Sequence, residues 1–200
     1  MALARTAVAV VAAGAMAMLS ARAGTPGAPD AQGAPDASTP APPPLTGPAL
    51  QSAVDALLER GADGDAWRPL GPWAVPVLER IARDGRAPPR RREQAIRSLG
   101  ALEVPGAAAP LRAITADARA PEDERCRAAF ALAQQQGPAA VADLEPLLQD
   151  PRDALRAGAA RGLGQAGGDD ARKALEDRLE LEETPVVREE IQRTLTLMQP

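Results

Sequence analysis

The chain of 200 residues has no histidine, no tyrosine and a single cysteine. Without histidine it cannot form a serine–histidine triad, a histidine-ligated zinc site or a histidine-bound haem, and one cysteine cannot form an internal disulfide. Aromatic residues and isoleucine are also scarce, with one Phe, two Trp and four Ile against 46 Ala and 22 Leu. Because sheets are rich in β-branched and aromatic residues, the ordered part is predicted to be all-α.

Lysine is nearly absent too, since 22 of the 23 basic residues are arginine, and the formal net charge is −4. An acidic chain does not attract nucleic acid or anionic lipid through its overall charge. The residue types that are present also lack the common catalytic and metal-binding sets. We therefore expect no nucleic-acid partner, no metal, no cofactor and no enzymatic activity.

Residues 1–23 have the pattern of a secretory signal peptide. Arg5 supplies the positive charge, residues 6–19 carry no charge, and the Ala-Arg-Ala sequence of residues 21–23 fits a small-x-small cleavage site. The uncharged stretch is shorter than the ~20 residues that span a bilayer, which favours cleavage over the alternative of a retained anchor. We expect an exported, periplasmic or secreted chain with no stable membrane insertion after cleavage.

Residues 24–48 contain eight Pro and four Gly. This composition cannot bury a core, so the segment is predicted to be a disordered spacer. A proline-rich ligand for a partner is the alternative. The folded domain is therefore expected to cover residues 49–200.

The remaining chain contains an internal repeat of about 32 residues. In each unit an Arg is followed by a small or apolar residue three positions later and by Leu seven positions later. These arginines are Arg92, Arg125, Arg156 and Arg188. A second apolar helix follows each of the first three, so each unit is predicted to be a helical hairpin.

Both ends of the repeat array have their own pattern. A helix over residues 49–60 is expected to pair with one over 73–83, and residues 185–198 are expected to form a final single helix. This gives about four and a half hairpins. Trp67 and Trp73 are predicted to cover the amino-terminal end of the stack, because a helical solenoid must close its apolar ends.

The segment PRDALRAGAARGLGQAGGDDARKAL at residues 151–175 resembles the HEAT repeat of the phycobilisome-lyase-like type. That repeat has an x-V-R-x-x-A-x-x-x-L-G helix before an a-v-x-x-L helix. The resemblance weakens at the ends, where Thr196 and Met198 replace small residues and the first hairpin lacks the Arg. It implies a right-handed α-α superhelix that binds proteins along an extended surface. Some relatives attach bilin chromophores to proteins, an activity that the repeat alone does not imply.

The repeated arginine lies in the middle of the apolar arc of its helix, so its charge needs a partner. Acidic residues recur at a spacing of 33 just before the next arginine. We predict a structural ladder in which each acid pairs with the arginine that follows it: Asp84 with Arg92, Asp117 with Arg125, Asp150 with Arg156 and Glu183 with Arg188. Small residues directly before the repeated Leu indicate close helix packing; they are Ser98, Ala131, Gly162 and Thr194, with Gly158 in the same helix as Gly162.

The outward face of the first helices carries one aligned column of candidate binding residues. It consists of Arg97, Phe130, Arg161 and Arg193, with Arg90, Gln94, Cys126 and Arg127 nearby. Phe130 is either a contact residue or an isolated apolar residue on the surface. The arginines next to Cys126 favour a lower thiol pKa, but no base is placed beside it, so an inert thiol is favoured over a nucleophile.

The second helices are expected to line the concave side, and their charge changes along the chain. Arg80 and Arg83 lie towards the basic end, and the acidic end carries Glu145, Glu176, Asp177 and Glu180. This asymmetry is either an ordinary solvated surface or a docking surface for a partner of opposite gradient. Asp63 and Asp65 resemble the start of a calcium loop, but the later ligands are missing.

These features predict an exported HEAT-repeat scaffold that mediates protein–protein interaction without catalysis. Two alternatives remain open. One is an accessory or lyase-like subunit that acts on a protein substrate, and the other is a structural protein that assembles end to end through its basic and acidic ends. The identity of the partner and the oligomeric state are not defined by the sequence.

The signal peptide gives a first prediction. The exported protein should begin at Gly24, because the cleavage motif directly precedes that residue. Intact mass measurement of the protein purified from the cell envelope or medium tests this. A chain that keeps residues 1–23 and partitions into detergent would show that the segment is an anchor.

Overall fold

The computed structural model describes residue 45 and residues 47–62, 64–104 and 106–198. The elements in this part of the chain are helical, as the composition predicts. The α-helices are α1 (Gly47–Glu59), α2 (Gly64–Trp67), α3 (Ala74–Arg83), α4 (Pro89–Ala101), α5 (Ala108–Ala116), α6 (Glu122–Gln136), α7 (Val141–Leu144), α8 (Asp153–Ala166), α9 (Gly168–Leu181) and α10 (Pro185–Leu197). Three short 3₁₀ segments join them: η1 (Gly71–Trp73), η2 (Gly137–Ala140) and η3 (Glu145–Gln149).

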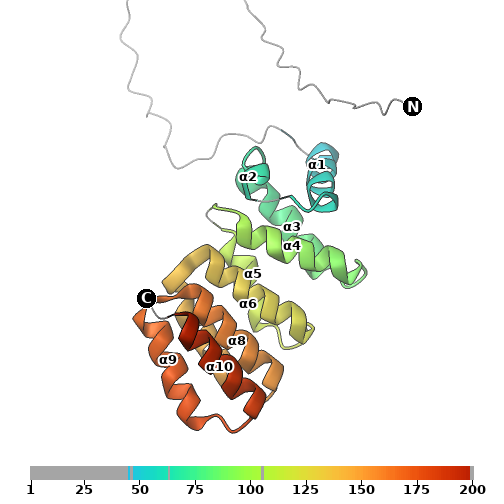
Figure 1. Cartoon of the computed structure of the whole chain (residues 1–200). Coiled ribbons are helices and arrows are strands. Elements are labelled where there is room, and N and C mark those ends of the chain that lie inside the picture. The colour runs from blue at the N-terminus through green and yellow to red at the C-terminus, as the bar shows by residue number, and fades with distance from the viewer. Residues whose placement is uncertain (1–44, 46, 63, 105, 199–200) are drawn as a thin grey trace, which may run out of the picture. The chain divides into compact units, whose positions relative to one another are not determined.

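These helices form four hairpins and a final single helix, in agreement with the predicted repeat. The first-helix layer consists of α4, α6, α8 and α10, each packed against the next, and Figure 1 shows them following one another from green to red. The second-helix layer contains α3, α5, α7 with η3, and α9, and its members contact one another far less. Because the first helices lie closer to one another than the second helices do, the stack curves with the first-helix layer on its inner side.

The start of the folded domain differs from the prediction. The first helix begins at Gly47, so residues 47–48 belong to the folded domain and not to the expected spacer. The predicted signal peptide and residues 24–44 lie outside the described residues. Within the described part, no helix is both long and apolar enough to cross a bilayer.

Proline and glycine set the ends of the first helices. Pro89 and Pro185 occupy the first position of α4 and α10, where the missing N–H has no helical partner to lose. Gly137 and Gly167 follow α6 and α8 with φ of +56° and +71°. These positive φ angles favour glycine and reverse the chain towards the second helix of the unit.

Glycines also allow the first helices to pack closely. A Cβ built on Gly100 of α4 would lie 2.7 Å from the Cβ of Ala131 on α6. On α8, a Cβ at Gly158 would overlap the sulfur of Cys126, and one at Gly164 would overlap the side chain of Thr194 on α10. The predicted close packing at Gly158 is therefore present, and each interface within the layer has such a contact.

Buried arginines connect each unit to the next. The guanidinium of Arg92 on α4 donates to Glu124 on α6 through Nε at 2.8 Å, and to the carbonyl oxygen of Ala87 in its own turn. Arg125 on α6 donates through Nε to the carbonyl oxygen of Thr115 at 2.9 Å, and its Nη1 lies 3.5 Å from Asp150. Arg92 therefore bonds the turn before its own helix and an acid of the next first helix, whereas Arg125 bonds the end of α5 in the preceding unit and the acid of the turn before α8.

The contact between Arg156 and the turn that joins α9 to α10 is the most extensive. Arg156 donates to Glu182 through Nε at 2.7 Å and through Nη2 at 3.0 Å, a two-pronged pair. Its Nη1 donates to the carbonyl oxygen of Asp150 at 2.9 Å. Arg178 also donates to Glu182, at 2.7 Å. Because Glu182 is only 3 % exposed, these donors replace the water that its charge has lost.

The predicted partners of these arginines are wrong. Arg92, Arg125 and Arg156 each pair with an acid that follows in the chain. Asp84 and Asp117 instead accept hydrogen bonds from the backbone N–H two residues later, both at 2.9 Å. Asp150 makes the same turn at 3.0 Å and adds the ion pair to Arg125. The physical reason is that the carboxylate of an aspartate at a turn accepts a hydrogen bond from the backbone N–H two residues later, and this bond holds it in its own turn.

The end of the ladder also differs from the prediction. The buried acid of the last unit is Glu182, and the predicted Glu183 is exposed. Arg188, the last arginine of the ladder, donates to the carbonyl oxygens of Leu179 and Glu182 at 2.8 and 2.7 Å.

Replacing Arg156 tests whether the units act as one stack. Arg156→Ala should reduce the free energy of unfolding by about 3 kcal/mol, because Glu182 loses its main partner while staying buried. Arg161→Ala is the control on the same helix. Its side chain is 46 % exposed, so the loss should be at most about 0.5 kcal/mol. Chemical denaturation measures both, and equal losses would contradict the structural role of the ladder.

A pH dependence follows from the same contact. Arg156, helped by Arg178, lowers the pKa of Glu182 from an ordinary 4.5 to about 2. The unfolded chain therefore binds the extra proton between these values, and stability should fall as pH drops from about 4.5 to about 2. Glu182→Gln should remove up to about 3 kcal/mol of that pH-dependent change. Denaturation curves at several pH values measure it, and an unchanged pH profile in the variant would contradict this assignment.

Candidate functional site

A groove opens on the first-helix layer. It has a volume of about 1280 Å³ and is lined by α4, α6 and α8, with residues of the α1–α2 turn at one end. A smaller side hollow of about 510 Å³ continues it over α8, α9 and α10. Phe130 and Arg161 line both, so the two hollows share a boundary.

The groove owes its shape to small side chains. Ala101, Ala131, Ala154 and Ala157 line it together with Gly158. The same small residues that let the helices pack closely therefore leave the layer hollow on its outer side. The prediction that the second helices line the concave side is wrong, because close packing of the first helices curves the stack in the opposite sense.

The predicted column lies along this surface. Arg97 on α4, Phe130 on α6 and Arg161 on α8 line the groove, and Arg193 on α10 lines the side hollow. They occupy the same position of successive repeats, so they form one row across neighbouring helices. Phe130 is 42 % exposed and is the only phenylalanine of the chain.

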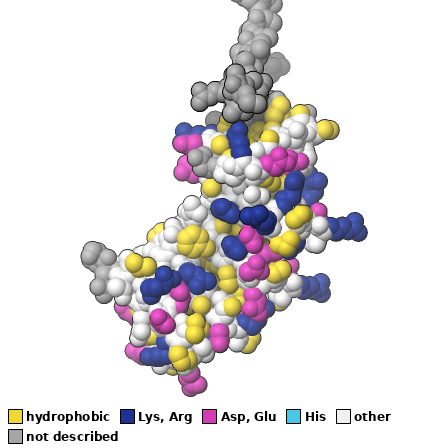
Figure 2. Space-filling view, turned by 45° about the vertical axis from the view of Figure 1, so that its right-hand side comes forward, with side chains coloured by type: hydrophobic (Ala, Val, Ile, Leu, Met, Phe, Trp, Pro, Cys, Tyr) yellow, Lys and Arg dark blue, Asp and Glu magenta, His cyan; other side chains and the backbone are white. Residues whose placement is uncertain are grey.

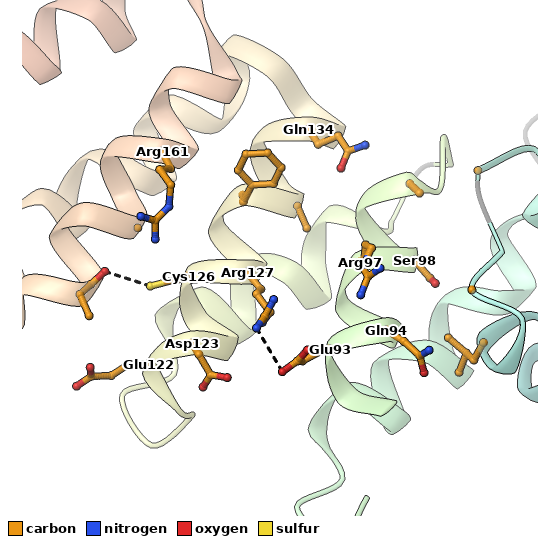
Figure 3. A pocket seen from close by; sticks show the side chains of 18 of the residues that line it. Glu93, Gln94, Arg97, Ser98, Glu122, Asp123, Cys126, Arg127, Gln134 and Arg161 are labelled. Carbon is orange, nitrogen blue, oxygen red and sulfur yellow. Dashed lines mark hydrogen bonds and ion pairs between the residues drawn. The ribbon is translucent and has the colours of Figure 1, made fainter. Parts of the chain in front are cut away.

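Several charges near this row neutralise one another. Arg127 lies 3.3 Å from Glu93, an ion pair that Figure 3 draws as a dashed line. Arg161 and Arg193 share one carboxylate, that of Glu190, at 3.5 and 2.6 Å. Acidic and basic side chains are interleaved on the face seen in Figure 2.

Arg97 has a different environment from its neighbours in the row. Its side chain is exposed, and no ion pair is recorded for it among the described residues. The acids of the groove lie elsewhere, since Glu122 and Asp123 are at the amino-terminal end of α6, away from Arg97 and Arg161 in Figure 3. Glu122 also lies 3.6 Å from Arg152. The row therefore carries excess positive charge on both sides of Phe130.

Cys126 lies in the wall of the groove and points towards α8. It is half-buried, and its thiol donates to the carbonyl oxygen of Ala154 at 3.3 Å. Burial raises the pKa of this thiol, and the opposing effect of Arg161 and Arg125 is smaller. The expected lowering by neighbouring arginines is therefore not found, and Cys126 has little thiolate at neutral pH.

The other predicted surface residues lie away from the groove. Arg80 on α3 hydrogen-bonds Gln51, Arg83 lies 3.4 Å from Glu79, and Arg90 is exposed at the start of α4. The four acids of the second-helix layer are also exposed: Glu145, Glu176, Asp177 and Glu180. These basic and acidic residues of α3, η3 and α9 all belong to the second-helix layer, and none of them lines the groove or the side hollow.

Sequence reasoning missed the acids that set the charge of the row. Glu93 and Glu190 each lie next to an arginine of a neighbouring helix, and only the packing of α4 on α6 and of α8 on α10 brings them together. The small residues of the groove carried a usable signal, because Gly100, Gly158 and Gly164 all belong to first helices. This distribution indicates which layer is tighter.

The remaining predictions concern metals and the amino-terminal end. Asp63 lies outside the described residues, and Asp65 forms an exposed ion pair with Arg68 at 3.1 Å. In the described part of the chain, no three acidic, cysteine or histidine residues are grouped as metal ligands. Trp67 is fully buried and Trp73 is half-buried in η1.

This architecture defines an all-α helical repeat fold. Residues 118–196 match the family of HEAT repeats. They include α6, α8 and α10, which provide three of the four residues of the row. No curated protein matches the sequence.

A solved structure supports the same fold. The chain is 22 % identical to a chain in the complex of CpcE and CpcF of phycocyanin lyase from Nostoc sp. PCC7120, covering 72 % of this chain and 98 % of that chain with a TM-score of 0.54. A designed armadillo repeat protein in complex with the peptide (KR)4 is 18 % identical, covering 76 % and 82 % of the two chains with a TM-score of 0.49.

Proposed function

We propose that this protein is an exported repeat scaffold that binds a segment of a partner protein in the groove of its first-helix layer. The observation that carries the proposal is the groove itself, with an exposed Phe130 between two arginines. Aromatic and arginine side chains supply most binding energy at protein interfaces. An elongated groove over several parallel helices is suited to a chain segment.

The solved structure of CpcE and CpcF is a complex of two proteins, which is consistent with a protein partner for this chain. It does not favour a lyase activity here. The single thiol donates to a backbone carbonyl, and its pKa is raised, whereas a nucleophile needs the thiolate. The proposed function therefore contains no catalytic step.

The last helix of the stack favours binding of another protein over end-to-end assembly of copies of this chain. α10 exposes Glu189, Gln192, Arg193 and Thr196 along its length, and Val186 and Leu197 at its two ends. A terminal helix whose exposed middle is polar is the usual way in which repeat proteins close their stack. The groove, in contrast, is lined by the aromatic ring of Phe130 and by small side chains.

Affinity capture with the full chain as bait tests the proposal. We expect partner proteins to be retained by the wild type and reduced by about tenfold or more in a Phe130→Ala and Arg161→Ala double variant, because both residues line the groove. A Glu176→Ala and Asp177→Ala double variant of the second-helix layer is the matched control and should retain them. Equal recovery from both variants, or nothing retained above bare resin, would contradict the proposal.

A further inference from the structure

The row of Arg97, Phe130 and Arg161 has a regular spacing. These residues occupy the same position on α4, α6 and α8, which pack directly against one another. Packed helices are separated by about 8–10 Å. The row therefore offers a cation, an aromatic ring and a second cation at intervals of about 9 Å.

A polyproline II segment has a matching repeat. It rises about 3.1 Å per residue with three residues per turn, so residues three apart lie on one side about 9 Å from each other. A β-strand does not match as well, since its side chains alternate with a period of two. The polyproline conformation therefore presents residues i, i+3 and i+6 on one side at the spacing of three successive packed helices.

The charge of the row selects the side chains of the ligand. Arg97 has no recorded ion pair within the described residues, and Arg161 shares Glu190 with Arg193, so two cations have one carboxylate between them. Of the acids that line the groove, Glu93 pairs with Arg127 and Glu122 lies near Arg152, whereas Asp123 is at the start of α6, away from Arg97 and Arg161 in Figure 3. Carboxylates are therefore favoured opposite Arg97 and Arg161, and an apolar side chain is favoured opposite Phe130.

We propose that the groove recognises an acidic, proline-rich segment of a partner protein in the polyproline II conformation. An acidic residue at i contacts Arg97, a large apolar residue at i+3 packs on Phe130, and an acidic residue at i+6 contacts Arg161, or the same order in reverse. This inference rests on the proposed function and gives the chemistry of the partner. The proline-rich backbone loses little conformational entropy on binding, which suits a shallow groove.

Binding of synthetic peptides to the full chain tests the register. The probe is Pro-Glu-Pro-Pro-Leu-Pro-Pro-Glu-Pro carrying an uncharged dye, with fluorescence anisotropy as the readout. The matched peptide Pro-Glu-Pro-Pro-Leu-Pro-Glu-Pro-Pro has the same composition, but its second Glu is moved by one residue. We expect the first peptide to bind about 3- to 10-fold more tightly, and this preference should shrink at high salt.

Protein variants then assign the contacts. Arg97→Gln, Arg161→Gln and Phe130→Ala should each weaken binding of the first peptide by about 3- to 10-fold. Arg90→Gln is the control, because Arg90 is exposed on the same helix as Arg97 and does not line the groove. Circular dichroism and thermal unfolding check that every variant is folded.

Three results would overturn the inference: equal binding of the two peptides, equal effects of Arg97→Gln and Arg90→Gln, or a short oligothymidylate that binds more tightly than the peptide and depends on the same arginines. The last result would indicate a general polyanion site. If the peptides fail while capture of partner proteins still depends on Phe130 and Arg161, the proposed function stands and only this ligand chemistry is wrong. If both fail, both proposals are wrong.

Discussion

The fold depends on charged side chains placed between helical units that have little apolar surface of their own. Alanine and glycine dominate the contacts between first helices, and such residues bury little area each. A buried guanidinium compensates because it bonds in several directions at once. Arg156 bonds the carbonyl oxygen of Asp150 in the turn that ends the preceding unit and the carboxylate of Glu182 in the turn before α10, so the position of one hairpin fixes the next.

The forward direction of this ladder has a simple physical origin. Each arginine lies near the start of its helix, where the carbonyl groups of the preceding turn are close and have no helical partner. The remaining N–H groups then face the neighbouring helix, and Glu124, Asp150 or Glu182 meets them. An acid in the preceding turn is poorly placed for this, because it already closes its own turn through a backbone N–H.

Sequence reasoning predicts the parts of this structure that are periodic. The hairpins, the final helix and the row of Arg97, Phe130 and Arg161 follow from spacing, because equivalent positions of a repeat lie on equivalent faces. The acid partners and the hollow side do not follow from spacing. Arginine is long enough to reach an acid on either neighbour, and the curvature depends on how closely two layers pack. Spacing predicts Glu183 as the buried acid, but Glu182 is buried and Glu183 is exposed. An error of one residue therefore exchanges a buried position for an exposed one.

The two arginines of α8 show how one helix serves both stability and recognition. Arg156 and Arg161 are five residues apart, which at about 100° per residue places them on clearly different faces of the helix. The first is buried against the next unit, and the second is exposed to the groove. Arg156 and Arg161 have no hydrogen-bond or ion-pair partner in common among the described residues. The residue at the position of Arg161 can therefore differ between repeats without disturbing the contacts of the buried arginine. The row already varies in this way, from Arg97 to Phe130 and back to Arg161, while Arg92, Arg125 and Arg156 stay the same. A repeat protein built like this can alter what it binds one helix at a time and keep its stack intact.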